Sequence, residues 1–344
     1  MPGQALTISR THLARLFGKP IGTVQPRRNI CGRLTRGYST LRILFVAATL
    51  LMNCYALQAQ SDRPATSPDL DVISIDTSLV TINVSVRDHK NHQLPGLKVE
   101  DFRITDQGKT VQPELLDSQG PASIVFVIDV SSSMRAHWPE LKKGLKKFLA
   151  KENAGSDYTL ITFNEKAQLV TKSVEAKQLW EGFNTLRPYG ETALYDGLLL
   201  GLEQLEQVPQ RHKALVLLSD GEDNSSQAGL AMVEQKTLAH RATIYSVGIV
   251  FDERLFPYQI NGKKLLKELA GATGGMVHFP ETLRLANVLD LIREDLSHQY
   301  SLSYYPPEKT AGWHKVEVNI SQNANRLNLR YQQRYQMKTS RALD

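Results

Sequence analysis

Cysteine is almost missing from this sequence of 344 residues: only Cys31 and Cys54 are present, and both lie within residues 1–59. The rest of the chain therefore has no disulfide framework and no thiol chemistry. The nine histidines show no metal-ligand spacing, which argues against zinc, and we expect His212 and His240 to lie at the surface. The sequence also lacks a glycine-rich phosphate motif and a nucleophile elbow, which argues against a nucleotide-binding enzyme and a serine hydrolase.

Acidic residues are absent from residues 1–59, which hold seven arginines and one lysine. Of the 41 basic residues in the chain, 41 − 8 = 33 remain beyond this segment, against 35 acidic residues. The formal charge of +6 therefore becomes 33 − 35 = −2 without the segment. No basic stripe remains in the rest of the chain, so we do not expect nucleic acid as a partner.

A long hydrophobic run is absent as well. The apolar stretch Ile43–Leu51 is shorter than the roughly 20 residues that a membrane-spanning helix needs. Arginines precede it and polar residues follow it, which is the order of a secretory signal. We predict a cleaved leader over 1–59, a linker over 60–70, and an exported protein of the periplasm, cell envelope or extracellular space. The alternatives are an uncleaved leader, which would be the only membrane contact, and lipidation at Cys54.

What the sequence does have is a regular alternation of apolar runs and amphipathic patterns from Ser123 onward. Ile124–Ile128 and Ala214–Leu218 are continuous apolar runs, as expected for strands that are covered on both faces. Trp138–Lys151 has the apolar spacing of an amphipathic helix. The alternation predicts an α/β fold with a doubly wound, mainly parallel sheet, which we place at 121–298.

Strictly alternating segments lie on either side of this α/β region. Val80–Val86 and Val316–Ile320 alternate apolar and polar residues, which predicts half-buried strands. We predict a β-rich N-terminal module at 71–120 and a C-terminal β segment at 299–338, with a tail at 339–344. We favour pairing of these two segments into one small sandwich-like module over a separate β appendage at each end.

Three short polar segments lie where predicted strands end or predicted helices begin. Asp129, Ser131 and Ser133 follow the first buried strand with a spacing that lets alternate side chains converge on one point. Thr192 precedes a predicted helix, and Asp220 follows the second buried strand. The carboxyl ends of parallel strands meet at one edge of an open sheet, where ligands bind. Two carboxylates and three hydroxyls are hard oxygen ligands, so we predict a Mg²⁺ site, with Mn²⁺ as the alternative ion.

These segments resemble the von Willebrand factor type A family, whose metal-ion-dependent adhesion site has the pattern D-x-S-x-S, then Thr, then Asp. The resemblance covers about residues 121–298, and the flanks resemble a narrower group of bacterial secreted proteins with this domain. It implies that Ser131 and Ser133 bind Mg²⁺ directly, and that the other three residues bind directly or through water. Ser132 and Glu191 stand where the family often has glycine.

The predicted ligand set favours adhesion over catalysis. Two carboxylates and neutral oxygens leave Mg²⁺ electrophilic, with water in its remaining positions. An acidic side chain of another protein would displace one of these waters, so we predict a binding module for a protein that presents Asp or Glu, and not an enzyme. In the family that these segments resemble, ligand binding can be coupled to a shift of the last helix, which we expect at Leu283–Leu296, and such coupling is a hypothesis for this chain. The alternative is a structural envelope component in which the metal rigidifies the domain.

Simpler roles exist for several of these residues. The serines at 131–133 would also suit the cap of the next helix. We interpret four nearby polar residues as solvated or turn residues: Asp196, Glu222, Asp223 and Asn224. For Asp223, a second interpretation is that it supports the metal ligands without binding the ion itself. The lysines of the predicted helix Trp138–Lys151 are interpreted as its solvated face.

Overall fold

The computed structural model describes residues 79–117, 120–151, 154–208, 212–249, 260–280, 285–321 and 327–337. All of them belong to one compact unit, Ile75–Asp344. The predicted leader at 1–59, linker at 60–70 and tail at 339–344 lie outside the described residues. Among the helices that the structure describes, none is long and apolar enough to cross a membrane.

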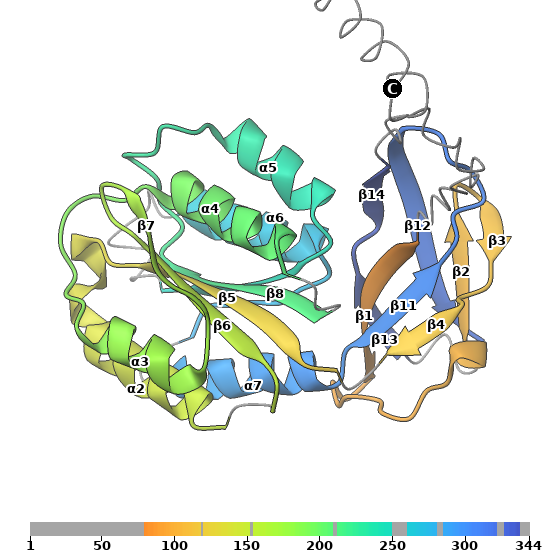
Figure 1. Cartoon of the computed structure of the whole chain (residues 1–344), viewed down its shortest axis with the longest axis horizontal. Helices are drawn as coiled ribbons and strands as arrows, with labels where there is room; N and C mark the ends of the chain where they lie inside the picture. Colours follow the sequence, from red (N-terminus) through yellow and green to blue (C-terminus); the bar gives the residue numbers. More distant parts are fainter. Residues whose placement is uncertain are drawn as a thin grey trace, which may run out of the picture. The chain divides into compact units, whose positions relative to one another are not determined.

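A six-stranded sheet with the order β10-β9-β8-β5-β6-β7 forms the centre of the α/β part (Figure 1). Only β7 runs antiparallel to its neighbour, so the sheet is mainly parallel. Every residue of β5 is buried, as its continuous apolar run predicts. The strands are β5 (Ala122–Asp129), β6 (Asp157–Phe163), β7 (Ala167–Val174), β8 (His212–Ser219), β9 (Thr243–Gly248) and β10 (Val277–His278).

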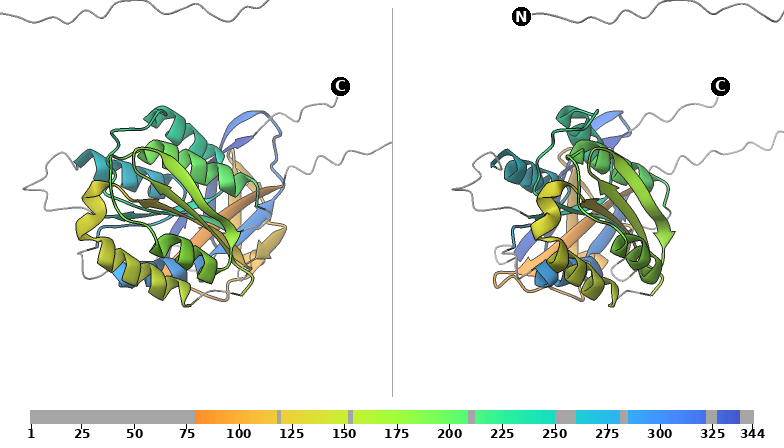
Figure 2. Two further views of the ribbon diagram at one scale, coloured as in Figure 1. Left: turned by 60° about the vertical axis from the view of Figure 1, so that its left-hand side comes forward. Right: turned by 90° about the vertical axis from the view of Figure 1, so that its left-hand side faces the viewer.

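Helices cover both faces of this sheet, as the two further views also show (Figure 2). One face packs against α2 (Trp138–Leu149), α3 (Ala176–Asn184) and α7 (Leu285–Ser297). The other face packs against α4 (Leu194–Glu206), α5 (Leu230–Ala239) and α6 (Ile260–Ala272). This arrangement is the predicted doubly wound fold, and the fold class is therefore confirmed.

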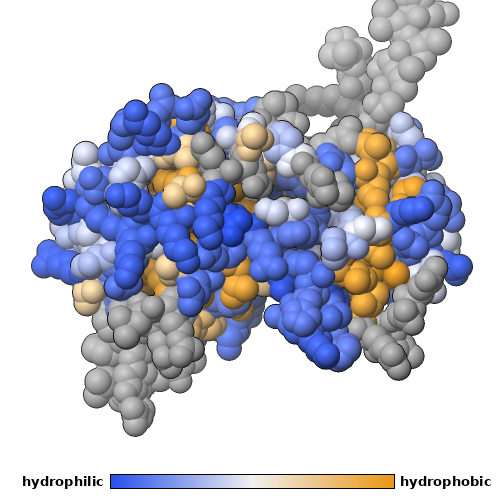
Figure 3. Space-filling view, turned by 90° about the horizontal axis from the view of Figure 1, so that it is seen from below, coloured by the Kyte–Doolittle hydropathy of each residue, from blue (hydrophilic) through white to orange (hydrophobic). Residues whose placement is uncertain are grey.

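Lysines of α2, which were interpreted as a solvated face, contact the neighbouring helices. Lys142 donates to the Asn184 carbonyl oxygen at the end of α3, and Lys147 pairs with Asp290 on α7. The Lys146 ammonium lies 5.6 Å from the ring centre of Trp180. These contacts connect α2 to both neighbouring helices, within a surface that is mostly hydrophilic when the molecule is viewed from below (Figure 3). Apolar residues gather in that view on the side of the small sheets.

Two small antiparallel sheets make up the rest of the unit, with the orders β13-β1-β11-β4 and β14-β12-β2-β3. The N-terminal strands β1 and β2 pair with β11 and β12 from beyond the α/β part, so both flanks share each sheet. Alternate residues of β12 are buried, as its sequence pattern requires. The strands are β1 (Val80–Asp88), β2 (Phe102–Asp106), β3 (Lys109–Val111), β4 (Leu115–Asp117), β11 (Tyr300–Tyr304), β12 (Gly312–Ile320), β13 (Leu327–Tyr331) and β14 (Arg334–Met337), with a short 3₁₀ turn, η1 (Val99–Asp101), before β2.

A buried carboxylate, Asp295 near the end of α7, joins the α/β part to the small sheets. Its Oδ1 atom lies 3.0 Å from a guanidinium nitrogen of Arg87 and 2.6 Å from one of Arg330. The Tyr245 hydroxyl donates to Oδ2 over 2.8 Å. Although burial raises the pKa of Asp295, the charge of Arg330 and the hydrogen bonds around the carboxylate hold it below its usual value. Ser85 and Gln93 complete the ring of donors.

Candidate metal centre

The predicted ligand residues sit where two neighbouring strands end. Asp129 is the last residue of β5, and Asp220 directly follows β8. These strands run parallel with Ile128 beside Leu218, so the two aspartates leave the sheet next to each other. Thr192 lies two residues before α4. The topology therefore brings the three predicted segments to one edge of the sheet.

The first segment is shaped by bonds among its own residues. The Ser131 amide donates to Asp129 Oδ1 over 2.8 Å, and the hydroxyl oxygens of Ser131 and Ser133 are 3.0 Å apart. A 3₁₀ helix, η2 (Ser132–Ala136), follows, but the Ser131 side chain makes no capping bond to it. The Ser131 side chain therefore does not cap the helix that follows it.

Backbone bonds attach the second segment to the first. The Ser132 amide donates to the Gly190 carbonyl oxygen over 3.0 Å, and the Tyr189 amide donates to the Val130 carbonyl oxygen over 2.8 Å. These two bonds run in opposite directions between the two loops. They fix the stretch that leads to Thr192 against the loop that carries the serines.

Asn224 holds Thr192 from the other side. The Thr192 amide donates to Asn224 Oδ1 over 2.8 Å, and the Asn224 amide donates back to the Thr192 carbonyl oxygen over 3.0 Å. Both of these bonds are made by the Thr192 backbone. Asn224 was interpreted as a turn residue from sequence, and the structure adds this connection between the second and third segments.

Ser219, which was not among the predicted site residues, links the third segment to Asp129. Its hydroxyl donates to Asp129 Oδ2 over 3.0 Å and accepts the Gly221 amide over 3.0 Å. The Glu222 amide donates to Asp220 Oδ1 over 3.1 Å. The only sequence signal for Ser219 was its position directly before Asp220.

The two aspartates are deeply buried: Asp129 is 0% exposed and Asp220 is 5% exposed. Burial, followed by the charge of Asp220, raises the pKa of Asp129 to about 7. Burial also raises the pKa of Asp220, against hydrogen bonds that include one from Ser133. Within the described ranges, neither carboxylate forms an ion pair with Lys or Arg. The two buried carboxylates thus lie together among hydroxyl and backbone donors, and the basic side chain that acts on them is His137, whose charge lowers the pKa of Asp220.

Direct interactions thus connect Asp129, Ser131, Ser133 and Asp220, and Thr192 joins them through the bonded loops. Their roles as ligands stay a prediction. The described part of the chain contains no cluster of three or more His, Cys, Asp or Glu side chains placed to hold a metal ion. The predicted set differs from such a cluster because three of its five members are hydroxyls.

The neighbouring acidic residues have structural roles. Asp223 Oδ1 accepts the Tyr195 amide in the first turn of α4 over 3.2 Å. The Asp196 carboxylate accepts the Gln227 and Ala228 amides over 2.9 and 3.0 Å. These bonds hold the loop after Asp220 against α4, so Asp196 and Asp223 are more than solvated turn residues.

The expectation that His212 and His240 lie at the surface is wrong, because they are 3% and 9% exposed. His212 begins β8, and its Nδ1 atom lies 3.2 Å from the Ser301 hydroxyl on β11. His240 lies beside Glu206, with 3.3 Å between Nε2 and the carboxylate. His212 is covered because the start of β8 packs under a strand from beyond the α/β part, a contact that local sequence does not reveal.

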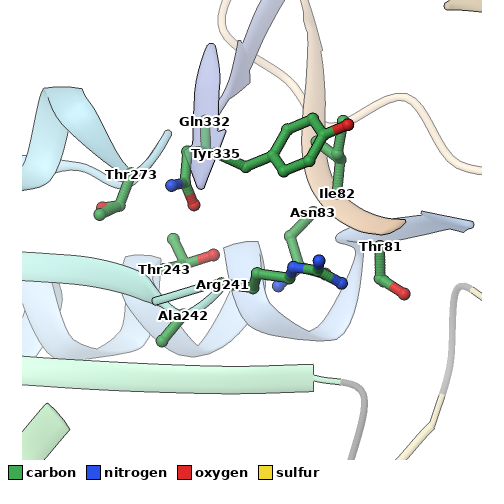
Figure 4. A pocket seen from close by; sticks show the side chains of 9 residues that line it. All are labelled: Thr81, Ile82, Asn83, Arg241, Ala242, Thr243, Thr273, Gln332 and Tyr335. Carbon is green, nitrogen blue, oxygen red and sulfur yellow. The ribbon is translucent and has the colours of Figure 1, made fainter. Parts of the chain in front are cut away.

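A small pocket lies between β1 and the start of β9 (Figure 4). Arg241 and Thr243 line it from the α/β part, and Thr81 and Tyr335 line it from the small sheets. It has room for about one water molecule. This pocket is therefore too small for an organic ligand.

Residues 124–222 match the family model of the von Willebrand factor type A domain. The matched stretch includes all five predicted ligand residues. The chain thus contains a von Willebrand factor type A domain, and the resemblance that the sequence motifs indicated is confirmed. A comparison with curated protein sequences found no match.

Solved structures with a similar fold come from animals and bacteria. Proximal thread matrix protein 1 from the mussel byssus is 18% identical with a TM-score of 0.45, over 56% of this chain and 50% of that one. The chain thus spans about half the length of the mussel protein. A von Willebrand factor type A protein from Catenulispora acidiphila is 14% identical with a TM-score of 0.44, over 76% and 74% of the two chains. The domain of the type V pilus tip protein Mfa5 from Porphyromonas gingivalis is 13% identical with a TM-score of 0.42, over 52% and 95%.

Proposed function

We propose that this protein is an exported binding module that captures an acidic side chain of a partner protein through a bound Mg²⁺ ion, with Mn²⁺ as the alternative ion. Asp129, Ser131, Ser133, Thr192 and Asp220 would hold the ion. Export is inferred from the basic and apolar pattern of residues 1–59. The match to a von Willebrand factor type A domain supports binding over catalysis, because proteins with this domain are mostly adhesive or structural.

The observation that carries the proposal is a pair of buried carboxylates that form no ion pair with Lys or Arg among the described residues, with His137 as the basic side chain that acts on Asp220. Asp129 and Asp220 repel each other in a site where burial already disfavours their charged forms. A divalent cation would offset both costs. The hydroxyls of Ser131 and Ser133 are 3.0 Å apart beside these carboxylates and add neutral oxygen donors. Carboxylate and hydroxyl oxygens are the ligands that suit Mg²⁺, so the residues present fit this ion.

When bound, Mg²⁺ would supply an electrophilic position for an incoming carboxylate. The chain itself orients the oxygens, because each loop is bonded to another: Ser132 to Gly190, Thr192 to Asn224, and Asp129 to Ser219. Such a preformed arrangement lowers the cost of ordering the site when the ligand arrives. Tyr189, which is 54% exposed and fixed to the first loop by its amide, is available for contact with the partner.

The alternative proposal is a structural envelope component in which the ion rigidifies the domain. The same bonds between the loops favour it, because they make this edge of the sheet a single connected unit. The two proposals differ in one consequence. Removing the metal abolishes partner binding under the first, and only lowers the unfolding temperature under the second.

The test is titration calorimetry of the full chain with Mg²⁺ and Mn²⁺, with Asp129→Ala as the inactive variant and Glu203→Gln as an exposed control. We expect saturable binding to wild type and to the control, and none to Asp129→Ala. Peptide arrays with a central Asp, and matched arrays with a central Asn, then probe the partner chemistry. Capture on the Asp array that EDTA abolishes supports ligand binding. Metal binding with equal signals on both arrays favours the structural alternative, and absence of metal binding to wild type contradicts both.

A further inference from the structure

The first turn of α6 touches the loop that carries Asp220, and the contact is glycine against glycine. A Cβ atom at Gly262 would lie 2.6 Å from the Asp220 carbonyl oxygen and 2.9 Å from the Gly221 carbonyl carbon. A Cβ atom at Gly221 would lie 2.5 Å from the Gly262 carbonyl oxygen. Gly221 also has a φ of +88°, which favours glycine. The two backbones can approach this closely only because neither residue has a side chain.

Glu222 completes the same contact. Its Oε1 atom accepts the Gly262 amide over 3.3 Å, at a turn of α6 whose amides have no partner within the helix. A carboxylate is favoured there because the N-terminus of a helix carries partial positive charge. Glu222 is the acidic residue nearest to Asp220 along the chain, and this bond directs it toward α6. The contact therefore fixes the Asp220 backbone and also gives a third carboxylate a partner other than a metal ion.

We propose that Gly262 is a positioning residue for the metal centre, which sets the place of Asp220 and keeps Glu222 out of the ligand set. The expected effect of Gly262 on Mg²⁺ binding rests on the proposed function. The two nearest atoms that a side chain at 262 would meet are backbone atoms of Asp220 and Gly221, which cannot rotate away, and the third is the Glu222 Oε1 atom at 3.0 Å. A larger residue at 262 thus displaces the Asp220 loop, the start of α6, or both. Neither Gly262 nor its partner Gly221 has a local sequence signal for this role beyond being glycine.

The same helix offers a matched control. Gly271 lies in α6 as well, and a Cβ atom there would meet nothing within 4 Å. Alanine has a higher helix propensity than glycine, so Gly271→Ala and Gly262→Ala should both favour the helix itself. Only Gly262→Ala places a methyl group against Asp220 and Gly221. A difference between the two variants therefore reports the contact and not the helix.

The first measurement is Mg²⁺ titration calorimetry on the full-length variants. We expect Gly262→Ala to bind Mg²⁺ about 10- to 100-fold more weakly than wild type, as for other residues that orient metal ligands. Gly271→Ala should stay within about twofold of wild type, since most surface changes have small effects. Wild-type Mg²⁺ affinity in Gly262→Ala would overturn the proposal.

A second measurement works without metal. Amide hydrogen exchange in EDTA follows the Gly221 amide, which donates to Ser219, and the Glu222 amide, which donates to Asp220. We expect both amides to exchange faster in Gly262→Ala, with unchanged exchange in the middle of β8 as evidence of an intact fold. Should wild type fail to bind Mg²⁺, the proposed function fails, and this exchange still decides the positioning role. Unchanged exchange at both amides would then refute it.

Discussion

The molecule buries carboxylates in two regions, and the side chains that surround them differ in charge between the two. Asp295 is fully buried and surrounded by two guanidinium groups, two hydroxyls and an amide. Asp129 is fully buried next to Asp220, with hydroxyl and backbone donors but no basic side chain in an ion pair among the described residues. The pKa of Asp295 is held below its usual value, and the pKa of Asp129 is raised to about 7.

The difference separates a structural contact from a candidate binding site. The cost of burying Asp295 is met by side chains from β1, β13 and β9, which the fold itself supplies. At the carboxyl edge of the sheet, hydroxyl and backbone donors offset only part of the corresponding cost, so the pKa values of both aspartates stay raised. Carboxylates perturbed in this way are candidates for a functional site. Opposite responses to the same substitution, aspartate to asparagine, should follow.

The largest effect is expected for Asp295→Asn. The change leaves Arg87 and Arg330 without their common counter-charge, and breaking a buried ion pair in this way costs about 3–5 kcal/mol of unfolding free energy. Denaturant unfolding followed by circular dichroism measures the loss. Mg²⁺ affinity should be unchanged in the folded variant, because the described hydrogen-bond partners of Asp295 lie outside the metal-site loops.

Asp290→Asn is the matched control for this variant, since Asp290 lies on the same helix but forms partly exposed ion pairs with Lys147 and Lys151. Exposed ion pairs contribute roughly 0–1 kcal/mol. Equal losses of unfolding free energy for Asp290→Asn and Asp295→Asn would show that the buried network stabilises the protein no more than the partly exposed ion pairs do.

A pH series sharpens the comparison further. A carboxyl group with a lowered pKa in the folded state stabilises the protein above its unfolded pKa, about 3.9 for aspartate, and loses this contribution as pH falls through the folded pKa. The stability difference between wild type and Asp295→Asn should therefore be constant from about pH 5 to 7. Below about pH 4 it should shrink, by at most about 1.4 kcal/mol per pH unit. A difference that grows on acidification would contradict the lowered pKa.

The features that sequence predicted are those with a local pattern. Continuous apolar runs identified β5 and β8 as buried strands, and amphipathic spacing identified α2. Because parallel strands end at a common edge, the spacing of Asp129, Ser131 and Ser133 was enough to place a candidate site there. The last helix, expected at Leu283–Leu296, is observed at Leu285–Ser297. The predicted domain boundaries and the ligand roles of the five site residues stay predictions.

The features that sequence did not predict depend on contacts between distant residues. Asp295 meets Arg87 from a strand 208 positions earlier in the chain. Ser219 meets Asp129 across 90 positions, and Glu222 meets Gly262 across 40. Buried His212 depends on Ser301 in the same way. A single sequence carries no pairing information for such contacts, so the support of the site was less predictable than its ligands.

An effect smaller than that of Asp295→Asn, and of opposite sign, is expected for Asp129→Asn. In EDTA the change removes a buried charge that faces Asp220 and should raise the unfolding free energy by about 1–2 kcal/mol. The gain is limited because the amide has one acceptor oxygen, whereas the Ser131 amide and the Ser219 hydroxyl donate to the two different carboxylate oxygens. Glu203→Gln removes an exposed negative charge and should stay within about 0.5 kcal/mol of wild type. With saturating Mg²⁺ the order should reverse, because wild type gains binding free energy that the variant cannot. A loss of stability in EDTA as large as that of Asp295→Asn would mean that Asp129 is a structural residue, and that the two buried carboxylates do not differ as their surroundings indicate.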